Sequence, residues 1–186
     1  NAYAIVDPKL STCNYPFSEI CGAQVAWFIL GLLKKELKLN IDMKQFLDIL
    51  AIAIVADIMP LIDINRTLVQ EGLKVLMSSN RPASIIIRDF IKKSSLSSED
   101  IAFQIAPRIN AAGRLEDASI ALDFFTAKDT SRAYDLFEEL NNLNELRKET
   151  EAETTKKAIN LADNNDKIIV VADEGWHEGV VGIVAV

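Results

Sequence analysis

Apolar residues in the first half of the chain recur at helical spacing and are separated by short polar segments. Ser18 precedes a long apolar run and is a residue type that often caps helices, so a helix is predicted to begin there. Asp42 is expected to cap a second helix, and Pro60 to end it because proline cannot continue a helix interior. A third helix is predicted to begin at Asp63 or Asn65.

The middle of the chain predicts shorter helices around 84–91 and 98–105, and another over the segment DASIALDFFTA at 117–127. Between them lies APRINAAGRL at 106–115, where small residues separate two arginines. We expect a loop or a broken helix for this stretch. Its small residues would let a backbone or a ligand come close.

The helical pattern continues without interruption from about 130 to 163. It is amphipathic at first, and beyond Glu149 it becomes mostly charged. About 34 residues in one helix would span about 50 Å, longer than the core of a small domain. A helix that changes from amphipathic to polar in this way often bridges two domains.

Two segments have the composition of buried strands: Tyr3–Val6, which Asp7-Pro8 interrupts, and KIIVVAD at 167–173. The second is followed by a glycine-containing loop and a further helix. The fold class predicted is therefore α/β, with a helix-rich part over 1–128, an interdomain helix over 129–165 and the start of a second α/β domain at 166–186.

Composition is that of a soluble globular protein, with 49% apolar and 25% charged residues. The apolar runs are too short or too interrupted to span a bilayer, so no membrane association is expected, and two widely spaced cysteines suggest reduced thiols in the cytoplasm. Because the chain begins with Asn and ends inside an apolar run, we expect it to be an internal fragment of a longer protein.

The formal net charge of −7 argues against general attraction to nucleic acid, but charge is unevenly distributed. Residues 81–115 contain six basic and three acidic side chains. Arg108 and Arg114 lie in this region. Two readings stay open for them: a phosphate grip, since arginine binds phosphate in bidentate fashion, or ion pairs with Glu116 or Asp117 beside a tight helix contact.

Two other residues could contribute chemistry. Asp57 follows an apolar run at an expected helix C-terminus, where a carboxylate is electrostatically disfavoured, so it is either exposed or paired with a cation such as a metal. His177 is the single histidine, in the glycine-flanked segment EGWHEGVVG between a predicted strand and helix. A surface position and a role at an anion-binding helix start are both open. The sequence has no Walker-type, G-x-G-x-x-G or G-x-S-x-G motif.

Four stretches together resemble the RecJ family of single-strand-specific 5′→3′ DNA exonucleases, within the DHH phosphoesterase superfamily. They are CGAQVAWFIL, DILAIAIVADIMPLIDINRTLVQEGL, APRINAAGRLEDASIALDFFTA and GWHEGVVGIVA, which cover most of the chain. RINAAGR and WHEGVVGIVA are the most specific. The resemblance implies that 1–128 is the C-terminal part of a DHH domain and that 166–186 begins the DHH-associated domain.

The resemblance also implies site residues. Asp57 matches a ligand of the family's catalytic Mn²⁺ or Mg²⁺ ions, and Arg108, Asn110 and Arg114 match a region that faces DNA phosphates. His177 matches the start of the associated domain, which closes over the substrate channel in the family. The implied reaction is two-metal hydrolysis of single-stranded DNA in repair and recombination, with a single-strand-binding protein and a helicase as candidate partners.

The family's Asp-x-Asp and Asp-His-His motifs are absent from this sequence, so we expect no nuclease activity from this chain alone. The sequence leaves two alternatives open. One is a related DHH phosphodiesterase acting on short oligonucleotides or cyclic dinucleotides. The other is a DHH-like replication scaffold without catalytic activity.

Overall fold

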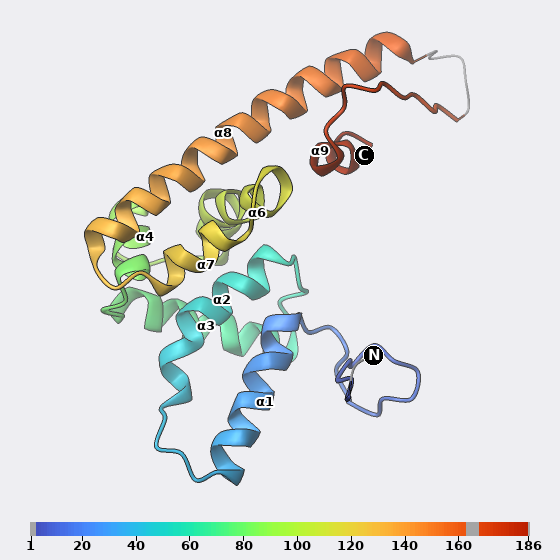
Figure 1. The fold of residues 1–186 in the computed structure, drawn as a ribbon. Coiled ribbons are helices and arrows are strands. Elements are labelled where there is room, and N and C mark those ends of the chain that lie inside the picture. The colour runs from blue at the N-terminus through green and yellow to red at the C-terminus, as the bar shows by residue number, and fades with distance from the viewer. Residues whose placement is uncertain (1–2, 163–167, 186) are drawn as a thin grey trace. The chain divides into compact units, whose positions relative to one another are not determined.

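The computed structural model describes residues 3–162 and 168–185, which divide into two compact units, Asn1–Ala106 and Pro107–Val186. Within the described ranges the regular structure consists of helices, and no strand occurs (Figure 1). This helix-rich architecture agrees with that part of the predicted fold class. The same residues contain no helix long and apolar enough to cross a membrane.

The first unit is built around α2, which packs against α1 and α3. Its elements are α1 (Gly22–Glu36), the 3₁₀-helix η1 (Met43–Phe46), α2 (Leu47–Ala56), α3 (Asp63–Ser78), α4 (Pro82–Ile91), α5 (Ser98–Asp100) and the π-helix η2 (Ile101–Ile105). Gly72 permits the close approach of α2 and α3, because a Cβ there would overlap the Leu47 carbonyl oxygen. Ile54 and Leu76, both fully buried, belong to the core between these helices.

Helix ends in this unit follow local hydrogen bonds. The prediction that Ser18 caps the first helix is wrong, because α1 begins after Cys21, whose N–H donates to Gln24 Oε1 at 2.9 Å. Asp42 caps η1 as predicted, accepting the Lys44 N–H at 3.0 Å. The next helix ends at Ala56, before Pro60, and α3 begins at Asp63, the first of the two predicted positions.

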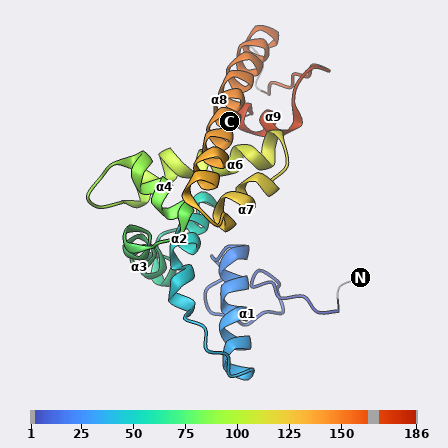
Figure 2. The same ribbon diagram turned by 60° about the vertical axis from the view of Figure 1, so that its left-hand side comes forward.

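The second unit contains α6 (Ala106–Leu115, of which Ala106 lies in the first unit), α7 (Ser119–Thr126), α8 (Thr130–Leu161) and α9 (Glu178–Val184). The long helix is confirmed: α8 has 32 residues, and Asp129 caps it by accepting the Arg132 N–H at 2.8 Å (Figure 2). Phe124 of α7 packs on Phe137 of α8, with ring centroids 5.6 Å apart. Thus α7 covers the apolar early turns of α8, and α9 packs against α8 as well.

Three local expectations differ from the structure. APRINAAGRL forms α6, a regular helix, because alanine, arginine and leucine favour helix and Ala111 and Ala112 are fully buried. Neither Tyr3–Val6 nor the described residues 168–173 form a strand, since a strand needs a partner to complete its hydrogen bonds. The segment 164–166, expected to end the long helix, lies outside the described residues. The predicted domain limits stay predictions.

Candidate functional site

Asp57 lies at the C-cap of α2, in a turn that reverses the chain. The Ile58 N–H donates to the Val55 carbonyl at 3.0 Å and the Met59 N–H to the Ile54 carbonyl at 3.1 Å, the pair of bonds of a Schellman motif. Ile58 occupies the left-handed position of this motif, with φ 54°. The Asp57 side chain is exposed in this turn, and its pairing with a metal stays a prediction.

A cavity of about 660 Å³ opens beside this turn. Asp57 and Met59 line it together with Cys21 and Gly22 from the start of α1 and with Asp7 from the preceding segment. Burial raises the pKa of the Cys21 thiol, and the nearby negative charge of Asp57 raises it further. The end of α2 and the start of α1 therefore meet at one cavity, with the Asp57 carboxylate at its wall.

The donors around this cavity fit a divalent metal only in part. Asp57 and Asp7 offer carboxylate oxygens, which Mg²⁺ and Mn²⁺ prefer. Among the described residues, however, no group of three His, Cys, Asp or Glu side chains is placed to hold a metal ion. Asp57 could supply one ligand of a larger set. A cation would also relieve its position at the negative end of the α2 dipole.

The basic residues of α6 lie on different faces of that helix. Asn110 and Arg114 are four residues apart, so they project from one face, and both are exposed. Arg108 is on the far side, half-buried, and its Nε donates to Asn141 Oδ1 of α8 at 2.7 Å. The fully buried Ala112, four residues after Arg108, shows that this side of α6 packs inward. This helix directs the Arg108 and Arg114 guanidiniums apart, and the phosphate grip that the sequence left open for them stays a prediction.

Burial lowers the pKa of the Arg108 guanidinium, and the negative charges of Glu145 and Glu138 on α8 oppose that shift. Arginine remains protonated in proteins, so Arg108 presents a permanent charge to the acidic surface of α8. Its observed contacts are those of a residue that attaches α6 to α8.

Arg114 and His177 come together around Gly179. Arg114 Nη1 donates to the Gly179 carbonyl at 3.1 Å, and the Gly179 N–H donates to His177 Nδ1 at 3.1 Å. A Cβ on residue 179 would overlap the Arg114 carbonyl oxygen, so this contact requires glycine. Because Nδ1 accepts, the neutral His177 ring carries its proton on Nε2, and the ring is exposed.

Four of the five predicted site residues thus belong to the second unit, and Asp57 belongs to the first. Within the second unit the structure joins Arg114 to His177 and separates Arg108 from Arg114. Two features were missed from the sequence. One is the Asp7 carboxylate at the cavity, signalled only by the Asp-Pro that interrupts an apolar run. The other is a buried amide pair, Gln24 and Asn65, for which the sequence offers no pattern.

Comparison with known proteins identifies related chains. The Single-stranded-DNA-specific exonuclease RecJ of Bacillus subtilis is 37% identical over 190 residues, which cover 98% of this chain and 23% of the relative. RecJ of Haemophilus influenzae is 33% identical over 204 residues, covering 99% of this chain and 35% of the relative. The chain thus spans well under half the length of these curated relatives. No protein-family model matches it.

Solved structures agree with the sequence comparison. The crystal structure of RecJ in complex with Mg²⁺ from Thermus thermophilus matches with a TM-score of 0.83 and 35% identity, over 92% of this chain and 27% of that one. A crystal structure of exonuclease RecJ bound to manganese matches with a TM-score of 0.83 and 34% identity, over 94% of this chain and 45% of that one. The resemblance seen in the sequence motifs is confirmed.

Proposed function

This chain is homologous over 98% of its length to RecJ exonucleases, and we propose that it forms part of a divalent-metal-dependent hydrolase of single-stranded DNA. The observation that carries the proposal is a match over more than nine tenths of this chain, to relatives named for this activity and to structures that hold Mg²⁺ or Mn²⁺. An exposed carboxylate at the wall of an open cavity, Asp57, supports it.

In this proposal Asp57 supplies one carboxylate ligand to the metal centre. The other ligands come from Asp-x-Asp and Asp-His-His motifs that this sequence does not contain, so they belong to other parts of the enzyme. Divalent metals in such hydrolases activate water and stabilise the charge that develops on the scissile phosphate.

The exposed face of α6 supplies the phosphate contacts. Asn110 and Arg114 present an amide and a guanidinium one turn apart, which suits successive oxygens of a nucleic-acid backbone. His177 lies beside them through Gly179 and can donate from Nε2. Arg108 acts behind this face by attaching α6 to α8. Digestion from the 5′ end in repair and recombination, with a single-strand-binding protein and a helicase as partners, completes the proposal.

The test is a substitution in the full-length enzyme. Asp57→Asn removes the ligand charge while keeping the side chain's shape, and we expect metal-dependent cleavage of a 5′-phosphorylated single strand to be nearly abolished. Asp63→Asn is the matched control, since Asp63 is an exposed aspartate at the next helix start. Retention of full cleavage by the Asp57 variant would contradict the role of Asp57 as a metal ligand, and absence of metal-dependent cleavage by the unsubstituted full-length enzyme would contradict the proposed function.

A further inference from the structure

Two amide side chains are buried next to the Asp57 turn. Gln24 of α1 and Asn65 of α3 are both 0% exposed, and Gln24 Nε2 donates to Asn65 Oδ1 at 2.7 Å. Buried amides are costly unless their hydrogen bonds are made, so such a pair requires a reason. Its two members come from different helices and are 41 positions apart in sequence.

The remaining bonds of this amide pair all go to the backbone of connecting segments. Asn65 Nδ2 donates to the Pro60 carbonyl at 2.9 Å and to the Glu19 carbonyl at 2.7 Å. Gln24 Oε1 accepts the Cys21 N–H at 2.9 Å. The amide pair therefore ties together the segment before α1, the first turn of α1 and the loop between α2 and α3.

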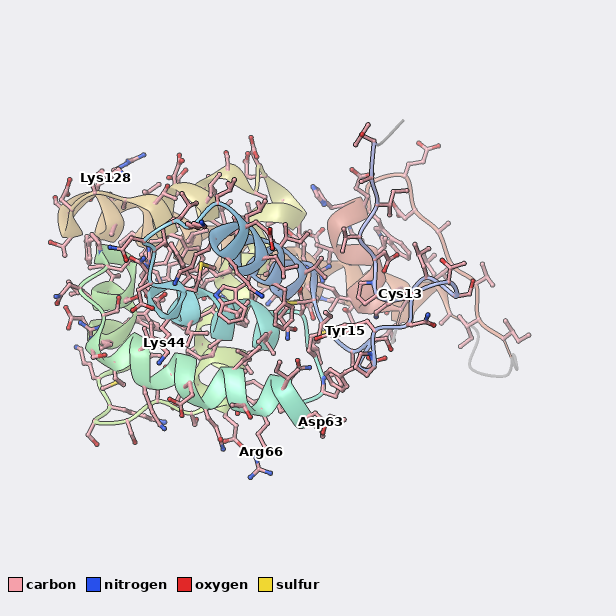
Figure 3. The ribbon with its side chains drawn as sticks, turned by 90° about the horizontal axis from the view of Figure 1, so that it is seen from below. Cys13, Tyr15, Lys44, Asp63, Arg66 and Lys128 are labelled. Carbon is pink, nitrogen blue, oxygen red and sulfur yellow. The ribbon has the colours of Figure 1, made fainter. Side chains whose placement is uncertain are left out.

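The burial of Asn65 contrasts with the exposure of the polar residues next to it. Asp63 and Arg66, which flank it in the first turns of α3, are exposed, and Arg66 points away from the helix (Figure 3). A polar residue in this turn could equally have faced solvent. Asn65 is instead fully buried against the loop that carries Asp57.

The loop that the amide pair holds is strained. Ile58 has φ 54°, in the left-handed region, which is unfavourable for a β-branched residue. Its side chain is 88% exposed, so little packing offsets that cost. Strained turns persist when the surrounding structure over-determines them. The bond from Asn65 to Pro60 closes this loop two residues beyond Ile58.

We propose that the Gln24–Asn65 amide pair is a positioning device that holds the strained turn 57–60 and thereby places the Asp57 carboxylate at its cavity. Its consequence for catalysis rests on the proposed function. Its effect on the turn does not, because the turn is held by bonds made within this chain. Both amides are fully buried and cannot reach a substrate, so both are positioning residues.

The test measures amide hydrogen exchange of 54–62 in the full-length protein. Asn65→Asp removes both donors and turns a carboxylate toward two carbonyls. We expect exchange of the Ile58 and Met59 amides to rise about tenfold or more, because the loss of a buried hydrogen bond makes opening of the turn more favourable by at least about that factor. Leu76→Ala is the control, because it destabilises the same unit from a fully buried position on α3. When the two variants lose the same thermal stability, Leu76→Ala should raise exchange of the Ile58 and Met59 amides far less than Asn65→Asp does.

Relief of strain provides the second arm. Asparagine tolerates the left-handed region, so Ile58→Asn should restore much of the protection lost in Asn65→Asp, and it should not rescue Leu76→Ala. Equal exchange in the Asn65 and Leu76 variants, or no rescue by Ile58→Asn, would overturn the proposal. If Asn65→Asp does not fold, Gln24→Met, which keeps the volume and removes the amide, is measured in the same way.

Cleavage assays separate this proposal from the proposed function. We expect Asn65→Asp to lower cleavage and Ile58→Asn to recover part of it. Unchanged cleavage together with increased exchange would overturn the positioning of Asp57. An active Asp57→Asn enzyme would instead overturn the proposed role of Asp57 as a metal ligand, and the exchange results would still decide whether the amide pair holds the turn.

Discussion

The two arginines of α6 are expected to respond differently to substitution. Arg114→Ala should weaken binding of single-stranded DNA, because a hydrogen bond to a charged group contributes about 1.5–3 kcal/mol. Arg108→Ala should chiefly lower the free energy of unfolding, since it removes the 2.7 Å bond to Asn141 and a half-buried stem. Chemical denaturation and DNA titration in the full-length enzyme distinguish the two effects.

Salt dependence sharpens this comparison. Loss of one phosphate contact should reduce the slope of log affinity against log salt concentration by about 0.7 for a single strand. We expect that change for Arg114→Ala and not for Arg132→Ala, which removes an exposed arginine at the start of α8. An Arg114 variant with unaltered affinity and slope would exclude the phosphate contact.

At the level of single residues, the sequence identified the types of side chain but not their directions. The sequence drew attention to Asp57, Arg114 and His177, because a charged side chain or a neighbouring glycine can be recognised without a structure. Arg108 was grouped with Arg114 because a loop between them was expected, whereas a helix with six-residue spacing directs them apart. Gln24 and Asn65 were not identifiable, since their contact depends on the packing of α1 against the rest of the unit.

Among the elements, the contact of α6 with α9 depends on Gly179. Gly179→Ala places a Cβ against the Arg114 carbonyl oxygen, so α9 should separate from α6 and protection of its amides should fall. Gly182→Ala in the same helix meets nothing within 4 Å and should stabilise by up to about 1 kcal/mol. Hydrogen exchange of 178–184 checks both, and equal protection in the two variants would contradict the prediction.

The free energy of unfolding should depend on pH through Asp100, in the helical segment that precedes α6. Hydrogen bonds from Lys93 and Ser97 hold the pKa of Asp100 at about 2, below its usual 3.8. Since the unfolded chain then binds the proton more readily, this stabilisation is present above pH 3.8 and is lost as the pH falls toward 2. Asp100→Asn should flatten the acid limb of a stability–pH curve. An unchanged limb would show that Asp100 does not contribute to it.

Helices were predicted well where periodicity and caps agree, as with Asp42 and the 32-residue α8. The start of α1 was missed because the helix is not capped by a serine. Instead, the Gln24 side chain accepts the Cys21 N–H at the helix start. APRINAAGRL was expected to be irregular because its small residues and glycine suggested a loop. Burial of Ala111 and Ala112 favours the helix. That burial depends on tertiary packing, which the local sequence does not show.

For the whole molecule, the order of motifs along the chain was more informative than composition. The net charge of −7 gave no indication of a nucleic-acid substrate, and the assignment came from four separated stretches. In the structure these four stretches are distributed over two units. Asp57 lies in one unit, and Arg114 and His177 lie in the other. The proposed metal ligand and the proposed phosphate contacts therefore lie in different units, and the remaining metal ligands are absent from the sequence.

From this we predict that the purified 186-residue chain does not degrade single-stranded DNA in the presence of Mn²⁺ or Mg²⁺. Its sequence has one histidine and no Asp-x-Asp, and the residues that the structure describes bring together no three metal-binding side chains. A 5′-phosphorylated oligonucleotide with the full-length enzyme as positive control provides the assay. Metal-dependent degradation by the isolated chain that Asp57→Asn abolishes would show that Asp57 needs fewer partner ligands than two-metal hydrolysis demands.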